Sequence, residues 1–285
     1  ETRLIFGETV ANPRTEVLDI PKVAAIAHEH HIPLVVDSTT TTPYLIRPFD
    51  LGADIVVHSA TKFLSGHGTV MAGLIVDGGT FDWESSDKFP QMTEKYAGFH
   101  NLSFVEEFGP AAYIARVRNE AARDFGACLA PNSSFLVLNG TETLSVRMDK
   151  HISNTKKVVE YLKNHEVVEW VSHPDLEDHP NHELAKTLLP KGSTAVFSFG
   201  IKGGRKIGQI FIDRLDLFSN LANIGDSKSL VIHPASTTHQ RMSVEDLEAA
   251  GISEGLIRLS IGIESADDLI EDLEKGFRAA AKALK

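Results

Sequence analysis

The sequence of 285 residues contains a single cysteine, Cys128. One cysteine excludes an intrachain disulfide framework and is typical of a reducing compartment, so we expect a cytoplasmic protein. No apolar stretch approaches the roughly 18 residues that a membrane span requires, and residues 1–4 do not have the pattern of a secretory signal. The sequence therefore predicts a protein that is neither exported nor inserted into a membrane.

Positive charge is also scarce. Lysine and arginine number 28 against 39 aspartate and glutamate residues, which gives a formal net charge of −11, and no cluster of basic residues appears. Nucleic acids and anionic membranes bind to concentrated positive charge, so neither is predicted as a partner. A chain of this length forms one or two domains and can bury both a cleft and a large interface.

The first half of the chain has the pattern of an α/β fold. Apolar runs at 3–6, 34–37, 53–58 and 70–76 lack polar alternation, as do parallel strands that are covered on both faces. Between the first two runs, Asp19 is a candidate N-cap for a helix that reaches about His30, with Pro21 in its first turn. Residues 77–103 show no clear periodicity and predict an ordered excursion from this sheet.

The second half predicts a smaller α+β domain. A helical pattern covers 104–123 and then 133–164, and the second stretch is long enough to cross between domains. Beyond it, strand-like runs alternate with helical ones, and Ser243 and Ser265 have the pattern of helix N-caps. We predict one domain over 1–148 and a second over 149–285. The expected strands are 167–171, 195–201 and 256–261, and the expected helices are 206–215, 244–250 and 266–284.

Two of the predicted strands end in groups that carry chemistry. Asp37 ends one strand, and Lys62 lies in a turn rich in serine and threonine directly after another. Enzymes that use pyridoxal phosphate need a lysine that holds the aldehyde as a Schiff base and a carboxylate that keeps the ring nitrogen protonated. Either residue alone is more often a cap or a surface charge, but together, and with Asn12 beyond the first strand, they predict a cofactor site.

The residues around Lys62 resemble a known family. Residues 52–68, GADIVVHSATKFLSGHG, resemble the cofactor-lysine motif of the Cys/Met-metabolism pyridoxal phosphate enzymes, and residues 11–13 and 35–37 resemble its upstream partners. The resemblance extends over the whole chain. It implies part of a mainly parallel-sheet cofactor domain of fold type I, followed by a smaller α+β domain.

The resemblance also implies roles for individual residues in binding pyridoxal 5'-phosphate. Lys62 would form the Schiff base and later carry the proton, while Asp37 would pair with the pyridinium nitrogen. Ser59 and Thr61 would bind the phosphate. A lysine with these duties works best with a pKa near neutrality, which burial beside a cationic group favours.

Four further positions follow from the same resemblance. Asn12 would hydrogen-bond the ring oxygen beside the imine, and Thr39 would pack its methyl group under the ring. Arg258, within the segment LIRLSIG at 256–262, would grip the substrate α-carboxylate, for which a planar guanidinium suits better than an ammonium. Asn223, where related enzymes more often have serine, would contact that carboxylate or the lysine.

Residues 77–103, 220–230 and 231–239 look most like the branch of the family that sulfhydrylates O-acetylhomoserine. This implies a γ-replacement in methionine biosynthesis, in which O-acetyl-L-homoserine and sulfide give L-homocysteine and acetate. It also implies a homotetramer built from dimers that share active sites. Cystathionine γ-synthase, O-succinylhomoserine sulfhydrylase and methionine γ-lyase remain alternative activities.

Two readings from other classes also remain. Residues 59–62 fit the S-x-x-K pattern of serine acyl-enzymes, although no S-D-N or K-T-G pattern follows. Alternatively, the chain is a non-catalytic fragment. Relatives have an additional N-terminal portion with an aromatic ring that stacks on the cofactor, a glycine-containing phosphate loop, and a tyrosine and an arginine that reach the neighbouring subunit. These have no counterpart in the sequence, so we expect that sequence is missing.

Histidines form two groups that superficially suggest a metal site. His28, His30 and His31 lie at a predicted helix end, and a solvated helix end is the simpler interpretation. His173, His179 and His182 fall in a loop rich in proline and aspartate, where histidines usually have no ligand. The sequence therefore predicts no metal.

Overall fold

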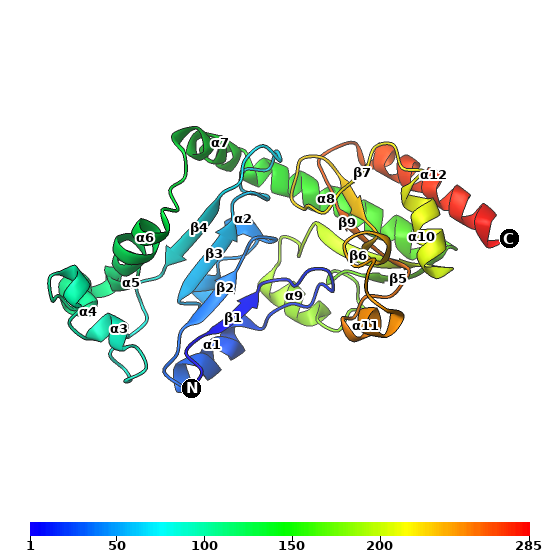
Figure 1. Cartoon of the computed structure of the whole chain (residues 1–285). Coiled ribbons are helices and arrows are strands. Elements are labelled where there is room, and N and C mark those ends of the chain that lie inside the picture. The colour runs from blue at the N-terminus through cyan, green and yellow to red at the C-terminus, as the bar shows by residue number, and fades with distance from the viewer.

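The computed structural model describes residues 1–285, apart from the side chain of Glu248. Its strands form two sheets, one with the order β1-β2-β3-β4 and one with the order β5-β6-β9-β8-β7. The sheets lie side by side, and the long helix α8 (Leu144–Lys163) runs along both of them (Figure 1). The predicted α/β class is confirmed, while the predicted boundary after residue 148 falls within α8 and stays a prediction.

The first sheet contains the parallel strands that the sequence predicts. β1 (Ile5–Glu8), β2 (Leu34–Asp37) and β3 (Ile55–Ser59) pair in parallel in that order. Helix α1 (Ile20–Glu29) connects β1 to β2, and the Asp19 carboxylate accepts a hydrogen bond from the Lys22 amide at 3.2 Å. The predicted N-cap is therefore confirmed, and Ile20, Ala24 and Ala27 form the buried face of the helix.

The prediction of a covered parallel strand over 70–76 is wrong. Strand β4 (Gly73–Asp77) pairs antiparallel to β3, and its side chains are exposed, for example Ile75 at 47%. A parallel neighbour requires a crossover of a dozen or more residues, usually a helix. The chain between β3 and β4 instead folds into the turn that contains Lys62, so it returns alongside β3 in the opposite direction.

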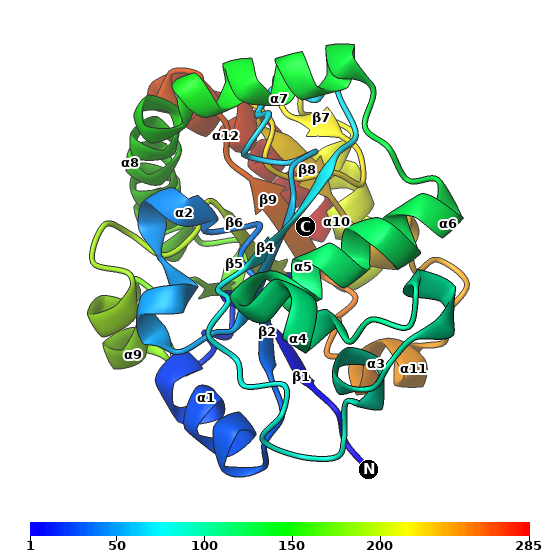
Figure 2. The same cartoon turned by 90° about the vertical axis from the view of Figure 1, so that its left-hand side faces the viewer.

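The excursion at 77–103 is ordered around a cluster of aromatic rings. Trp83 stacks on Tyr113 with ring centroids 5.5 Å apart, and Phe81 and Phe89 meet the same tryptophan edge-on. The short helices of this excursion and of the residues that follow it, up to residue 125, lie together beside the first sheet (Figure 2). They are α3 (Pro90–Thr93), η2 (Ala97–Phe99), α4 (Phe104–Phe108), η3 (Gly109–Ala111), α5 (Ala112–Arg116), the π-helical turn η4 (Val117–Ala122) and α6 (Arg123–Phe125).

Both long helices predicted for the middle of the chain are interrupted. The first breaks at Gly109, which has a φ of +51°, followed by Pro110, which has no amide hydrogen to continue the helix. The second divides at Thr143 into α7 (Pro131–Glu142) and α8.

Two further short helices follow β2, namely α2 (Thr42–Leu45) and η1 (Pro48–Leu51). In the described part of the chain, no helix is both long and apolar enough to span a membrane.

The second sheet is mostly antiparallel and packs against two helices. β9 (Leu256–Ser260) lies between β6 (Val196–Ile201) and β8 (Leu230–Ile232). Trp170, on the neighbouring β5 (Val168–Ser172), covers Gly200, where an added Cβ would lie 2.2 Å from its indole nitrogen. Helices α10 (Gly204–Ile212) and α12 (Ala266–Leu284) pack together through Phe211 and Phe277, whose ring centroids are 4.7 Å apart.

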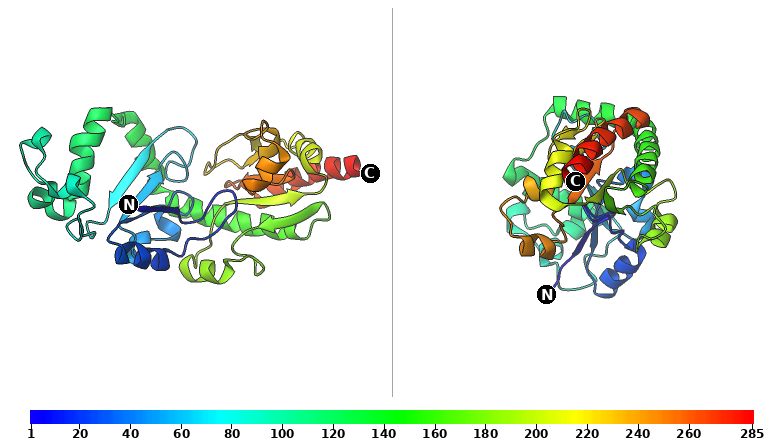
Figure 3. Two further views of the ribbon diagram at one scale, coloured as in Figure 1. Left: turned by 60° about the horizontal axis from the view of Figure 1, so that its bottom comes forward. Right: turned by 90° about the vertical axis from the view of Figure 1, so that its right-hand side faces the viewer.

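The remaining elements of this half include several that the sequence did not predict. Helix α9 (His182–Leu188) and the short strands β7 (Ser219–Asn220) and β8 carry no clear periodicity. β7 and β8 belong to the second sheet, whereas the helices α9, in yellow-green, and α11 (Val244–Ala249), in orange, lie outside it (Figure 3). The short helix η5 (Pro234–Ser236) follows β8. Ser243 accepts a hydrogen bond from the Asp246 amide at 3.1 Å, so its capping role is confirmed. Ser265 occupies the predicted N-cap position of α12, but its side chain makes no capping hydrogen bond.

Asp272 on α12 fixes the chain ahead of β7. Its buried carboxylate accepts hydrogen bonds from the backbone amides of Asp216, Leu217 and Phe218 at 2.9 to 3.1 Å. Substitution by alanine leaves three amides without their acceptor, so we expect Asp272→Ala to lower the free energy of unfolding by about 3 kcal/mol. Urea titration measures this loss. Glu271→Ala, at an exposed position on the same helix, should change stability by less than about 0.5 kcal/mol.

Candidate functional site

The predicted site residues of the first sheet lie at one edge. Because β1, β2 and β3 are parallel, the chain leaves all three strands on the same side of the sheet. Asp37 is the last residue of β2, Lys62 lies in the turn after β3, and Asn12 follows β1. The second sheet faces this edge, and it contributes Arg258 from β9 and Asn223 from the loop between β7 and β8 (Figure 1).

A continuous set of hydrogen bonds connects four of the predicted residues across the two sheets. The Lys62 amine donates to the side-chain oxygen of Asn223. The guanidinium of Arg258 donates to the backbone oxygen of Asn223 at 3.2 Å and to the side-chain oxygen of Asn12 at 3.5 Å. The structure therefore places Lys62, Asn223, Arg258 and Asn12 in one site.

Asp37, Thr39 and Ser59 form a second group at the strand ends. The Thr39 amide donates to Oδ1 of Asp37 at 2.8 Å, and the Thr39 hydroxyl accepts from the Ser59 amide at 2.8 Å. Thr39 thus ties the end of β2 to the end of β3. Within the described residues, no hydrogen bond reaches Oδ2 of Asp37 or the hydroxyl of Ser59, so both remain able to bind a ligand.

Thr61 is more constrained than the sequence suggests. Its hydroxyl accepts a hydrogen bond from the Ala72 amide at 2.9 Å and donates to the Ala72 oxygen at 3.2 Å. These bonds fasten the Lys62 turn to the residues that precede β4. A phosphate contact from Thr61 must replace the bond to the Ala72 oxygen, and its role in phosphate binding stays a prediction.

Gly225 is a site residue that the sequence reasoning missed. Its φ is +72°, and an added Cβ would lie 2.8 Å from the Phe63 nitrogen and 3.0 Å from the Lys62 Cβ. Only glycine lets the loop that contains Asn223 approach the lysine so closely. The Gly-Asp pair at 225–226 is a turn signal and marks the loop as structured, but nothing in the sequence shows that it touches Lys62.

The surroundings of Lys62 lower the pKa of its amine. Partial burial lowers the pKa of Lys62 from its ordinary value, and the positive charge of Arg258 lowers it further. Burial also lowers the pKa of His58, on β3, and the carboxylate of Asp37 partly opposes that effect. A neutral amine is the form that attacks a carbonyl and accepts a proton, and a lowered pKa makes this form easier to reach than it is for an ordinary lysine.

This electrostatic environment predicts how Lys62 responds to pH. Since a lowered pKa leaves more of the amine neutral at any pH below the ordinary value of 10.5, Lys62 should react with acetic anhydride at lower pH than a lysine in an unfolded peptide. Arg258→Met removes the repelling charge and should move the midpoint upward. Peptide mapping of the acetylated protein over a pH series gives both midpoints. Identical midpoints for Lys62 and the peptide would contradict the lowered pKa.

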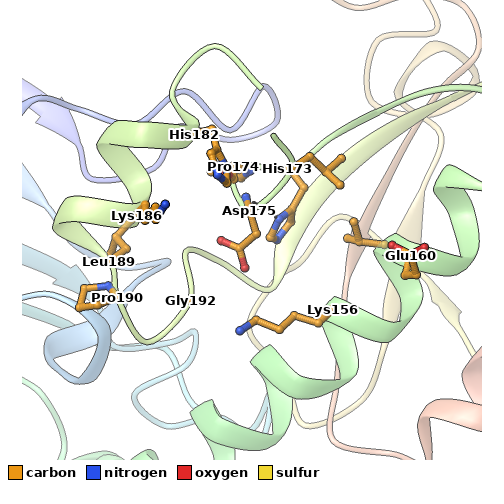
Figure 4. Close-up of a pocket in the computed structure, with 12 residues that line it drawn as sticks. Lys156, Glu160, His173, Pro174, Asp175, His182, Lys186, Leu189, Pro190 and Gly192 are labelled. Carbon is orange, nitrogen blue, oxygen red and sulfur yellow. Dashed lines mark hydrogen bonds between the residues drawn. The ribbon is translucent and has the colours of Figure 1, made fainter. Parts of the chain in front are cut away.

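The histidines have structural partners. A cavity of about 520 Å³ is lined by His173, His182, Asp175, Lys156 and other residues of α8, α9 and the connecting loops (Figure 4). The His173 ring bonds to the Thr194 oxygen at 3.1 Å and accepts from the Asp175 amide at 3.2 Å, which occupies both of its nitrogens.

His28, at the end of α1, pairs with the buried Asp54 at 2.9 Å, but its side chain is 44% exposed, and His30 and His31 are exposed too, so the predicted solvated helix end is confirmed. In the described part of the chain, no group of three or more histidine, cysteine, aspartate or glutamate side chains is arranged to hold a metal ion.

Comparison with known proteins identifies the family. The model of the family described as "Cys/Met metabolism PLP-dependent enzyme" matches residues 1–278. A sulfhydrylase of Gibberella moniliformis is 49% identical over 282 residues, and the O-acetyl-L-homoserine sulfhydrylase of Leptospira meyeri is 45% identical over 287 residues. Each alignment covers 98% of this chain and 65% of the relative.

A solved structure from Campylobacter jejuni, assigned as an O-acetylhomoserine (thiol)-lyase, superposes on this chain with a TM-score of 0.92 at 38% identity. The match covers 97% of this chain and 66% of that one, and the solved structure contains a lysine modified with the pyridoxyl group. The chain therefore spans about two thirds of the length of these relatives. The fold, the cofactor-lysine motif and the matched family model agree, and the chain belongs to the Cys/Met metabolism family of PLP-dependent enzymes.

Proposed function

We propose that the protein catalyses a γ-replacement in which O-acetyl-L-homoserine and sulfide give L-homocysteine and acetate. The observation that carries this proposal is the connected set of Lys62, Asn223 and Arg258, in which an amine of lowered pKa lies beside a guanidinium. A substrate with an amine and a carboxylate on one carbon presents complementary groups to this pair. The names of the relatives, O-acetyl-L-homoserine sulfhydrylase and homocysteine synthase, support the choice of reaction.

The residues present fit pyridoxal 5'-phosphate. Asp37 has an oxygen without a hydrogen-bond donor and suits the protonated ring nitrogen, while the Ser59 hydroxyl is available to the phosphate. Lys62 is the amine for the Schiff base, and Asn12 offers a side-chain amide to the ring oxygen. When bound, the cofactor supplies an aldehyde that holds the substrate amine and a ring that absorbs the electron pair from the α-carbon.

Lys62 moves the protons in this proposal. With the substrate held at the cofactor, the free Lys62 amine would remove the α-proton, and the same nitrogen would return a proton later in the reaction. The Asn223 side-chain oxygen accepts a hydrogen bond from this amine and so holds it in one place. A pKa below the ordinary value favours a lysine that must both accept and release a proton.

Arg258 binds the α-carboxylate. Its present bonds, at 3.2 and 3.5 Å, are long and lead to neutral oxygens, so a carboxylate is a stronger partner for the guanidinium. The ion pair between Arg258 and the α-carboxylate also holds the α-carbon of the substrate near Lys62. The S-x-x-K alternative has less support, because the Lys62 amine bonds to Asn223 and, among the described residues, no hydrogen bond joins it to the Ser59 side chain.

The reaction is tested with purified protein supplied with pyridoxal phosphate. We expect O-acetyl-L-homoserine and sulfide to yield homocysteine and acetate in equal amounts. Parallel assays replace the acetyl ester with O-succinyl-L-homoserine, replace sulfide with cysteine, or offer methionine alone. Preference for the succinyl ester, formation of cystathionine from cysteine, or cleavage of methionine without reaction with sulfide would contradict the proposal and identify the alternative activity.

The proposal extends to assembly and location. We place the protein in the cytoplasm as a homotetramer of dimers with shared active sites. The exposed apolar side chains of β4 support an assembly, because an apolar strand at a sheet edge is normally covered. The free Cys128 suits a reducing compartment, and the net charge of −11 gives nucleic acid no favourable surface.

A further inference from the structure

We propose that Arg147 on α8 is a positioning residue that fixes the Lys62 turn, and that the polar face of α8 sets where Lys62 lies relative to Arg258. This inference rests on the roles proposed above for Lys62 and Arg258. Arg147 does not belong to the set of hydrogen bonds that joins those two residues. It acts on the backbone directly after Lys62.

The contacts of Arg147 are unusual for a buried cation. Its side chain is 5% exposed, and it donates to the backbone oxygens of Phe63 at 2.8 Å and Leu64 at 3.3 Å, directly after Lys62. It also donates to the Gly140 oxygen at 2.6 Å and the Thr143 hydroxyl at 3.2 Å. All of these partners are neutral oxygens, and no carboxylate of the described residues forms an ion pair with it.

Burying a charge without a counter-ion is costly, and an apolar side chain of similar size fills such a space at less cost. Mere packing therefore does not account for an arginine at position 147. Its planar group of donors reaches several carbonyl oxygens at once in a fixed geometry, which an apolar side chain cannot do. The contacts instead indicate that Arg147 holds the shape of the turn that follows Lys62.

The same face of α8 holds the strand end beyond Arg258. The buried His151 bonds to the Ile261 oxygen at 2.7 Å, and the buried Asn154 donates to the oxygens of Gly262 at 3.0 Å and Glu264 at 2.8 Å. Positions 147, 151 and 154 are spaced i, i+4 and i+7, so they lie on one side of the helix. One helix thus fastens the Lys62 turn at one point and the end of β9 at another.

Steric contact adds to the hydrogen bonds. An added Cβ at Gly66, which has a φ of +69°, would lie 2.0 Å from Nη1 of Arg147. The His151 ring also meets Phe63 edge-on, with ring centroids 5.1 Å apart. The turn therefore packs directly against α8, and a change at either partner should displace it.

The test uses the protein with pyridoxal phosphate and two measurements. Hydrogen exchange of the peptide that covers residues 60–68 reports the turn without reference to the cofactor, and the pH midpoint of the absorption band of the lysine-bound cofactor reports Lys62. We expect Arg147→Met to speed exchange at least tenfold and to move the midpoint by a pH unit or more. Arg147→Lys, which retains the charge but not the set of donors, should lie between Arg147→Met and the parent.

Two controls separate positioning from general instability. Lys150→Met, at an exposed position on the same helix, should leave both readings unchanged. Gly66→Ala disturbs the contact from the other side, and Gly126→Ala is its match, because Gly126 has a φ of +70° but no heavy atom within 4 Å of an added Cβ. We expect fast exchange over 60–68 in Gly66→Ala but not in Gly126→Ala.

Exchange over 60–68 that stays at the parent rate in both Arg147→Met and Gly66→Ala would overturn the inference, as would an unchanged absorption midpoint in an Arg147→Met protein that binds the cofactor. Failure of the proposed function has a different result, because the absorption band would then be absent from the parent protein too. In that case the exchange measurement decides the positioning role by itself.

Discussion

Turnover of O-acetyl-L-homoserine should fall by about 10⁴-fold when Lys62 is replaced by alanine. The substitution removes both the amine that we propose binds the cofactor and the base that we propose moves the α-proton, and a positioned base alone contributes 10² to 10⁴. The described site offers no second amine, because the nearby cation is the guanidinium of Arg258. Steady-state rates of homocysteine formation measure the loss.

Lys150→Ala is the matched control, since Lys150 is exposed on α8 and should retain the parent rate. Borohydride reduction followed by peptide mapping gives a second reading. The pyridoxyl group should be found on the peptide that contains Lys62 in the parent protein and be absent from that peptide in the variant. A Lys62→Ala protein that keeps a tenth of the parent activity would show that Lys62 is not the catalytic lysine.

Replacing Arg258 by methionine should lower kcat/KM by about 10³-fold, mainly by raising KM. Truncation of one partner of a buried charge pair costs 2 to 5 kcal/mol, and the α-carboxylate would lose its counter-charge. Arg258→Lys should recover only part of this, because an ammonium cannot form the bidentate pair. Substrate titrations at saturating sulfide separate KM from kcat.

Arg278→Met provides the comparison for Arg258. Arg278 is an arginine on α12 that pairs with Glu274 at 2.9 Å, and its side chain is 76% exposed. Removing it should leave both kinetic constants within a factor of two of the parent. An Arg258→Met variant with an unchanged KM for O-acetyl-L-homoserine would assign the carboxylate to a different residue.

Much of the sheet edge that carries Asp37 and Lys62 could be predicted, because the sequence patterns that identify it are local. Asp19 caps α1 as its position before the helix suggests, and apolar runs identify β2 and β3. Parallel strands then bring Asp37 and Lys62 to one edge without further information. The predicted roles of Asn223 and Arg258, by contrast, depended on the family resemblance. Nothing in the spacing of these residues shows that they contact Lys62.

The features that escaped prediction depend on tertiary contact. The direction of β4 follows from the turn at Lys62, which takes the place of a crossover helix. The role of Arg147 requires that α8 pass beside that turn, although polar residues at 147, 151 and 154 among apolar positions on α8 are a usable signal. A buried stripe of polar side chains on a long helix indicates that the helix forms hydrogen bonds with the backbone of other segments. It does not indicate which segments these are.

The placement of the two tryptophans gives the protein a built-in optical label for each half. Trp83 is stacked on Tyr113 beside the first sheet, and Trp170 covers Gly200 in the second. Indole emission depends on its surroundings, so variants that retain one tryptophan each report a separate region. Coincident fluorescence transitions on heating would mean that the two sheets melt as one cooperative unit, with α8 as the element common to both.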